Sequence, residues 1–148
     1  MHIAYPAPVV VVDVANVMGA RADGWWRDRA GAALRLCQEV TALARRPGGA
    51  PPGGEAPAAA WVLVLEGRAR EAAAPLQEEP GGGQASGTAP VRVVCAPGSG
   101  DDAIVGVVAE TVARDENCLV VTADRELRQR CEELNASVVG PGWLLRLL

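Results

Sequence analysis

The sequence contains no lysine and no phenylalanine, and it has one histidine and one tyrosine. Because His2 lies at the N-terminal end, a Ser–His or Cys–His mechanism would lack a base near any later site. With so few rings, the core must be mainly aliphatic, with the four tryptophans as its few large side chains. All fourteen basic residues are arginines, and the net charge is −4. A polyanionic partner would therefore have to be met by a local Arg cluster or through bound metal.

Cysteine is sparse and forms no C-x-x-C pair. The four cysteines are Cys37, Cys95, Cys118 and Cys131. Scattered cysteines in apolar surroundings are typical of buried free thiols, so we expect neither a zinc site nor a disulfide framework.

A long hydrophobic run is also missing. The first apolar run, Val9–Val12, meets an acid at Asp13, and no basic region precedes it. We therefore expect neither a signal peptide nor a membrane span, and we expect a cytoplasmic protein.

Short apolar runs alternate with helix-forming segments along the chain. Strands are expected at Val9–Val12, Trp61–Leu65, Val91–Cys95, Cys118–Val121 and Ser137–Val139. Helices are expected at about Trp25–Arg46, Asp101–Arg114 and Arg125–Leu134, before a terminal helical turn. This alternation predicts an α/β fold, a three-layer αβα sandwich around a central, mostly parallel sheet.

The length of 148 residues predicts a single domain spanning residues 1–148. Two stretches, 47–60 and 77–90, are rich in Pro, Gly and Ala and offer little to bury. We expect both to be flexible surface loops.

Acidic residues follow four of the expected strands. Asp13 and Glu66 end the first two, Asp101 and Asp102 follow the third, and Asp124 follows the fourth. Carboxyl ends of parallel strands share one edge, where converging carboxylates repel one another unless a hard divalent cation such as Mg²⁺ or Mn²⁺ binds between them. The alternative is helix capping, by Asp124 and by a capping box of Ser99 with Asp102.

A dinucleotide-binding fingerprint is a rival interpretation of residues 98–103, which match its glycine spacing. In that motif a pyrophosphate rests on the helix N-terminus. Here Asp101 and Asp102 would repel it, so we expect no organic cofactor.

Three segments in order, residues 12–17 (VDVANV), 99–104 (SGDDAI) and 121–124 (VTAD), resemble the PIN-like nuclease superfamily, and its NYN branch in particular. The resemblance implies a PIN-like, Rossmann-type fold and a metal-dependent ribonuclease that hydrolyses RNA phosphodiester bonds. It implies catalytic roles for Asp13, Asn16, Asp101, Asp102 and Asp124.

The same resemblance implies that Asp13, Asp101 and Asp124 hold Mg²⁺ or Mn²⁺, with Asp102 and Glu66 as additional candidates. The sequence departs from the family at Glu66, where many NYN domains carry Asp before Gly. Many PIN-like proteins also place an acid in the helix after the first strand, and Glu39 is the candidate by position.

The segment from Arg21 to Arg29 has the composition of a nucleic-acid contact, with arginines for phosphates and indoles for stacking. The candidate RNA-binding residues are Arg21, Trp25, Trp26, Arg27, Arg29 and Arg68, and Arg70 would extend the basic rim. The alternative is that at least one of these tryptophans packs in the core.

Two other functions fit the same acids. One is a catalytically weak PIN-like module that binds RNA or a protein partner, since a fold does not fix a function. The other is a metal-dependent phosphohydrolase of small nucleotides. An RNA substrate is the expected partner, a membrane is not, and a homo-oligomer is compatible with the sequence.

Overall fold

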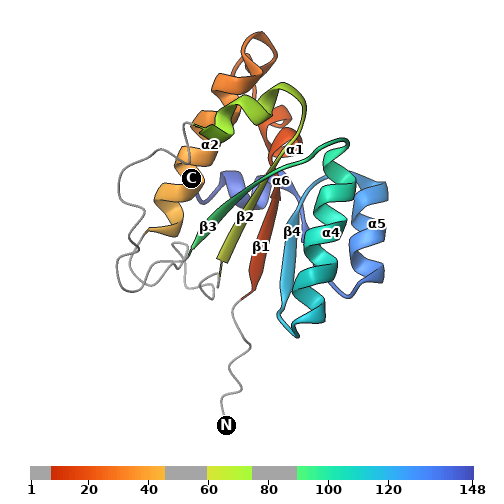
Figure 1. Cartoon of the computed structure of the whole chain (residues 1–148). Coiled ribbons are helices and arrows are strands. Elements are labelled where there is room, and N and C mark those ends of the chain that lie inside the picture. The colour runs from red at the N-terminus through yellow and green to blue at the C-terminus, as the bar shows by residue number, and fades with distance from the viewer. Residues whose placement is uncertain (1–7, 46–59, 75–89) are drawn as a thin grey trace.

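A parallel sheet forms the centre of the computed structural model, which describes residues 8–45, 60–74 and 90–148 (Figure 1). The described strands are β1 (Val9–Asp13), β2 (Ala60–Leu65), β3 (Val91–Cys95), β4 (Cys118–Val121) and β5 (Ser137–Val139). They lie in the order β3-β2-β1-β4-β5, and every neighbouring pair is parallel. The expected parallel sheet is confirmed.

Helices cover both faces of this sheet and make the three layers visible in Figure 1. One face carries α1 (Val14–Gly19), α2 (Arg29–Ala44), the 3₁₀ segment η3 (Gly67–Ala72) and α6 (Pro141–Leu145). The other face carries α4 (Gly100–Ala113) and α5 (Arg125–Glu133). None of the helices in the described ranges is long and apolar enough to cross a membrane.

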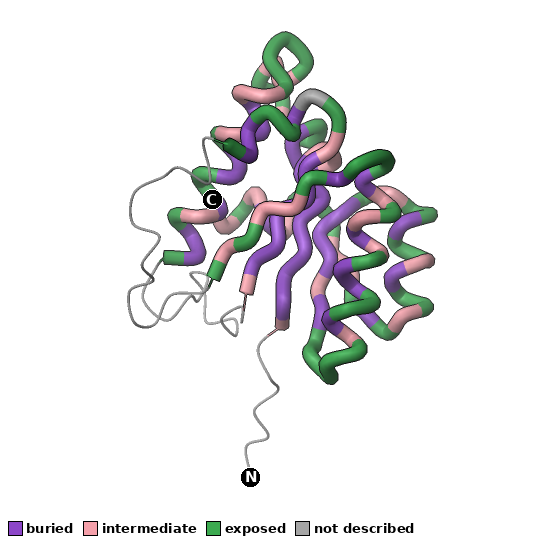
Figure 2. The backbone as a smooth tube through the Cα atoms, viewed as in Figure 1, coloured by how far each residue is buried: buried purple, intermediate pink, exposed green. Residues whose placement is uncertain are grey.

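The central strands β1 and β2 bury both of their faces, as Figure 2 shows. In β1, Val10 and Val12 belong to the core cluster under α2, whereas Val9 and Val11 belong to the cluster under α4. Successive side chains of a strand point to opposite faces, so a strand covered on both sides reads as a continuous apolar run. This explains why the sequence marks the strands so clearly.

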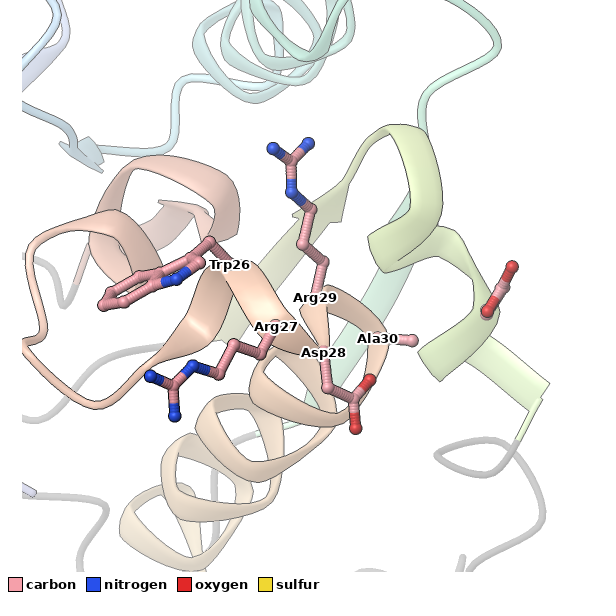
Figure 3. Close-up of a pocket in the computed structure, with 6 residues that line it drawn as sticks. Trp26, Arg27, Asp28, Arg29 and Ala30 are labelled. Atoms are coloured by element: carbon pink, nitrogen blue, oxygen red, sulfur yellow. The ribbon is translucent and has the colours of Figure 1, made fainter.

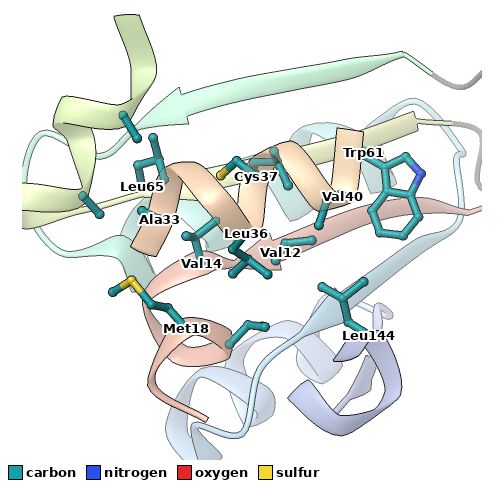
Figure 4. Close-up of a cluster of buried hydrophobic side chains, with 14 of the residues drawn as sticks. Val12, Val14, Met18, Ala33, Leu36, Cys37, Val40, Trp61, Leu65 and Leu144 are labelled. Atoms are coloured by element: carbon teal, nitrogen blue, oxygen red, sulfur yellow. The ribbon is translucent and has the colours of Figure 1, made fainter. Parts of the chain in front are cut away.

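The larger core cluster lies between the sheet and the layer that contains α2 (Figure 4). Its side chains are mainly aliphatic, and Leu36, Cys37 and Val40 face the sheet from α2. Trp61 at the start of β2 is 1% exposed and is the largest buried side chain of the described residues. The expected aliphatic core with few rings is confirmed.

The helix expected from Trp25 begins later, and this boundary is a correction. Residues Trp25–Arg27 form a separate 3₁₀ turn, η1, and α2 begins at Arg29. Asp28 has a non-helical backbone, and its Oδ1 accepts a hydrogen bond of 2.9 Å from the Gly31 N–H. An Asp N-cap of this kind sets the first helical residue, so the single helix expected from Trp25 is divided into η1 and α2.

Two helical elements were not expected from the sequence. Helix α1 is only six residues long and starts directly after β1, with Asp13 as its N-cap. Segment η3 follows Glu66. Elements this short carry too few periodic positions to stand out in a sequence pattern.

The cysteines are free, and three of the four are buried as expected. Burial raises the pKa of the Cys37 and Cys118 thiols to about 12 and that of Cys131 to about 11. Cys95 is exposed, so its expected burial is wrong. It lies at the end of β3, an edge strand of the sheet with only partial cover.

The two expected loops fall almost wholly outside the described residues. Within 47–60 only Ala60 is described, and it already belongs to β2. Within 77–90 only Pro90 is described, and its carbonyl accepts a hydrogen bond of 2.8 Å from the Trp61 N–H.

Candidate active site

The sheet order changes direction next to β1. From β1 the chain builds β2 and β3 on one side, then crosses to β4 and β5 on the other. In open parallel sheets ligands bind beyond the carboxyl ends of the strands at such a reversal point. In this chain the reversal lies between β1 and β4, which end at Asp13 and Val121.

Asp13 is a buried carboxylate at this point, with 7% of its surface exposed. Its Oδ1 accepts a hydrogen bond of 3.4 Å from the Asn16 N–H, and its Oδ2 accepts one of 2.9 Å from Thr122 Oγ1. Burial raises the pKa of Asp13 to about 6 although both hydrogen bonds lower it, and the charges of Glu66 and Asp101 raise it further. The protein therefore holds this carboxylate at a cost.

A small hydrogen-bond network joins the ends of β1 and β4. Asn16 Oδ1 accepts a hydrogen bond of 2.8 Å from the Ala123 N–H, and Thr122 Oγ1 accepts one of 3.2 Å from the Asp124 N–H. Thr122 is 2% exposed and was not among the predicted site residues. Its place inside the VTAD segment, directly after a buried strand, was the signal that could have identified it.

Glu66 joins the end of β2 to the start of α4. Its Oε2 accepts a hydrogen bond of 2.5 Å from the N–H of Gly100, which is the first residue of that helix. A carboxylate is favoured at the positive end of a helix. A Cβ at Gly100 would lie 2.7 Å from the same oxygen, so only glycine leaves room for this contact.

Asp101 and Asp102 open α4 but have different surroundings. The pKa of Asp101 is raised by burial first, then by the charges of Asp124 and Glu66, while Arg130 lowers it. Asp102 is exposed and forms an ion pair of 3.1 Å with Arg130, and its N–H donates to Ser99 Oγ at 3.3 Å. The Ser99 half of the expected capping box is thus confirmed, whereas the Asp102 carboxylate pairs with Arg130.

Asp124 is the N-cap of α5, where its Oδ1 accepts a hydrogen bond of 3.0 Å from the Leu127 N–H. The capping interpretation of Asp124 is thus confirmed, and its charge still acts on Asp101. The charges of Glu66 and Asp101 raise the pKa of Asp13, and the charges of Asp124 and Glu66 raise the pKa of Asp101. We call these four residues the acidic edge.

The acidic edge fits a hard divalent cation in its chemistry but does not enclose one. Carboxylate oxygens are the ligands that Mg²⁺ prefers. In the described part of the chain, however, no three His, Cys, Asp or Glu side chains form a group that could hold a metal ion. Asp13, Glu66 and Asp124 each direct one oxygen at a nearby backbone N–H.

The predicted RNA-binding residues separate into two groups. Arg21 forms a two-point ion pair with Glu39, with one contact of 3.3 Å between Nη1 and Oε1. Glu39 thus has a partner away from the acidic edge. Arg70 donates to the carbonyls of Gly67 and Ala96 at 3.0 and 3.3 Å. The side chain of Arg68 is outside the described part.

The other group surrounds the two tryptophans of η1. Trp25 is partly buried against the larger core cluster, so packing explains this ring. Trp26 meets it edge to face, with 6.0 Å between ring centroids, and is 57% exposed. The Arg27 and Arg29 guanidinium carbons lie 5.8 and 5.5 Å from the centroids of Trp26 and Trp25.

Trp26, Arg27 and Arg29 border a surface depression of about 360 Å³, shown in Figure 3. It is lined by Trp26, Arg27, Asp28, Arg29, Ala30 and Glu71, and we call it the Trp26 depression. Asp28 and Glu71 were not among the predicted binding residues. Glu71 comes from η3, an element that the sequence pattern did not indicate.

Comparison with family models, curated proteins and solved structures finds no match to this chain. The resemblance to the PIN-like superfamily therefore stays a prediction based on the three short motifs. The fold itself is given by the sheet and its two helical layers.

Proposed function

We propose that the protein is a metal-dependent ribonuclease whose site is the acidic edge. The observation that carries this proposal is the raised pKa of Asp13 and of Asp101, which Glu66 and Asp124 help to raise, at the reversal point of a parallel sheet. Titratable groups with raised pKa values that gather in such a place are candidates for a functional site. Capping accounts for the positions of Asp13 and Asp124, but it does not account for the raised pKa of the buried Asp13 carboxyl.

In this proposal Asp13, Asp101 and Asp124 hold Mg²⁺ or Mn²⁺. When bound, the cation would lower the pKa of the attacking water and offset charge on the scissile phosphate. The remaining residues position these acids. Thr122 donates to Asp13, and Asn16 ties α1 to the segment before Asp124.

Glu66, at the end of β2, and Asp102, in the first turn of α4, support the site. Glu66 accepts the Gly100 N–H and so fixes the helix start that presents Asp101. Asp102 pairs with Arg130 across to α5. We therefore assign Glu66 a positioning role rather than that of a principal ligand, and the same argument places Asp102 beside the site.

A second candidate is a PIN-like module with weak catalysis that binds RNA or a protein. It is favoured by one observation, the lack of a three-residue metal-holding group among the described residues. The third candidate, a hydrolase of small nucleotides, would use the same acids, so substrate choice has to be measured.

The test compares cleavage of a single-stranded RNA with hydrolysis of a nucleoside triphosphate, each with Mn²⁺, Mg²⁺ or chelator. We expect RNA cleavage that requires metal and disappears in Asp13→Asn. The matched control is Glu110→Gln, an exposed acid near the opposite end of α4 whose loss should leave cleavage unchanged. Metal-independent cleavage, or equal loss in both variants, would contradict the proposal, and triphosphate hydrolysis alone would favour the third candidate.

A further inference from the structure

Trp26 is a large apolar side chain that the fold holds at the surface instead of burying. More than half of it is exposed, and it is the exposed large hydrophobic residue of the described chain. Its edge meets Trp25, which packs on the core, and the Arg27 guanidinium lies over its ring, 5.8 Å from the centroid, so these two contacts restrict the orientation of the ring. An aromatic ring presented in one orientation is ready to receive another planar ring by stacking, because little conformational freedom is lost on binding.

The Trp26 depression combines this ring with both signs of charge. Arg27 and Arg29 supply guanidinium donors, while Asp28 and Glu71 supply carboxylates. Asp28 Oδ1 already accepts the Gly31 N–H, so its position is set by capping α2. Two positive and two negative side chains balance, and the depression therefore does not attract polyanions by net charge alone. A ligand that fits it must also offer a flat apolar face.

The depression lies on the carboxyl side of the sheet, the side of the acidic edge. Segment η1 follows α1, which starts at Asp13, and η3 follows Glu66 directly. In Figure 1 both segments extend beyond the strand ends where the acids lie. The depression and the acidic edge are therefore on the same side of the sheet, so one RNA strand can contact both.

We propose that the Trp26 depression binds one unpaired nucleotide of an RNA strand, with the base stacked on Trp26 and separate neighbouring phosphates bound by Arg27 and by Arg29, which extend in different directions in Figure 3. This rests on the proposed function for the nature of the substrate and specifies it as single-stranded RNA. Bases in a duplex have no free face for Trp26, whereas every unpaired base has one. Arg27 and Arg29 have planar donor groups that suit phosphate oxygens.

The experiment measures binding of a fluorescent single-stranded oligouridylate, and of the same strand in a duplex, with chelator present so that no metal-dependent cleavage occurs. We expect tighter binding of the single strand. Trp26→Ala should weaken it about tenfold, as expected for loss of one base stack, while Trp26→Phe should retain most of the affinity. Arg27→Gln should weaken binding and flatten its salt dependence. The control Arg128→Gln removes an exposed arginine of α5 and should change neither the affinity for the single strand nor its salt dependence.

Equal affinity for duplex and single strand, or unchanged affinity in Trp26→Ala, would overturn this inference. Because Trp26 is exposed, its variants should fold, and the Trp26→Phe variant separates loss of stacking from loss of the fold. The two proposals fail in different ways. Binding that depends on Trp26 without metal-dependent cleavage removes the ribonuclease function alone. Cleavage with binding that ignores Trp26 removes this site alone.

Discussion

At the scale of single residues, Asp13 is the clearest conflict between folding and charge. It is almost fully buried, yet its neighbours include two other carboxylates that raise its pKa. A group that ionises less readily in the folded state than in the unfolded state destabilises the fold once it is ionised. Such a cost persists in proteins where the group has a task that outweighs it.

We predict that Asp13→Asn makes the metal-free protein more stable at neutral pH and removes part of its pH dependence. The folded pKa of about 6 lies above the ordinary 3.8. The stabilisation by the bound proton is therefore complete below pH 3.8 and is lost as the pH rises through about 6. A shift of this size corresponds to about 3 kcal/mol at most, and we expect the variant to gain about 1 to 3 kcal/mol at pH 7. An Asn side chain can keep both hydrogen bonds of Asp13. Its oxygen can accept from the Asn16 N–H, and its amide nitrogen can donate to Thr122 Oγ1, because a hydroxyl accepts as well as donates.

Denaturant unfolding of both proteins between pH 3.5 and 8 measures this effect, with chelator and then with Mn²⁺. The wild type should gain stability from Mn²⁺ by mass action, and the variant should gain less. A variant that is less stable at pH 7 and keeps the full Mn²⁺ gain would show that Asp13 is purely structural.

At the scale of elements, the start of α4 is fixed by two contacts. The Gly100 N–H donates to Glu66, and the Asp102 N–H donates to Ser99. Together they set the first turn of the helix and with it the position of Asp101. The two glycines of this helix differ in surroundings, and this difference allows a matched comparison.

We predict that Gly100→Ala destabilises the protein, while Gly106→Ala stabilises it by up to about 1 kcal/mol. A Cβ at Gly106 meets nothing within 4 Å, so the substitution there only improves helix propensity. At Gly100 the new methyl displaces the Glu66 carboxylate and breaks its hydrogen bond, which should cost about 1 to 2 kcal/mol. Thermal or denaturant unfolding measures both.

The control for this comparison is the Glu66→Ala background. There the carboxylate is gone, so Gly100→Ala should no longer be more harmful than Gly106→Ala. If the difference between the two alanines survives in that background, the close approach of Glu66 is not its cause.

The contact between α4 and α5 leads to a third prediction, that Arg130→Gln raises the pKa of Asp101 further and hardly changes stability. Arg130 is the charge that lowers this pKa. Its ion pair with Asp102 is 40% and 76% exposed at the two side chains, and such pairs contribute about 0.5 kcal/mol or less. An NMR titration of the Asp101 carboxyl and an unfolding curve test both parts. The control is Arg128→Gln. Arg128 is an exposed residue of α5 that pairs with Glu132, so this substitution should leave the titration of Asp101 unchanged.

At the scale of the whole molecule, the sequence predicted the sheet because its central strands are buried on both faces. Val9–Val12 and Trp61–Leu65 are continuous apolar runs, and their order of alternation with helices predicted the layers. The missed helices, α1 and η3, depend on local capping and tertiary contact rather than on periodicity. The split between η1 and α2 depends on one Asp side chain.

The candidate site was predicted less completely than the fold. Strand ends brought Asp13, Glu66 and Asp124 to one edge, as the topology requires. What the pattern could not give is where each oxygen points, since capping and metal binding use the same residue types at the same positions. The hydrogen bonds of Glu66 and Thr122 needed the three-dimensional structure.

The thiols report on the integrity of both helical layers at once, and they give the last prediction. Cys37 lies in the core between α2 and the sheet, and Cys118 and Cys131 lie in the core on the other face. Cys95 is exposed at the edge of the sheet. Only the thiolate reacts, so burial and raised pKa values should make Cys37, Cys118 and Cys131 unreactive in the native protein.

We predict that a disulfide reagent modifies Cys95 rapidly in the native protein and modifies the other three together at the rate of global unfolding. The two helical layers share one sheet, so neither core should open while the other stays closed. Mass spectrometry of samples quenched over time identifies the modified residues, and Cys95→Ser should remove only the rapid phase. Modification of Cys118 and Cys131 well before Cys37 would mean that the layer of α4 and α5 opens on its own. In that case the acidic edge, which takes Asp101 and Asp124 from this layer, would be a dynamic site rather than a preformed one.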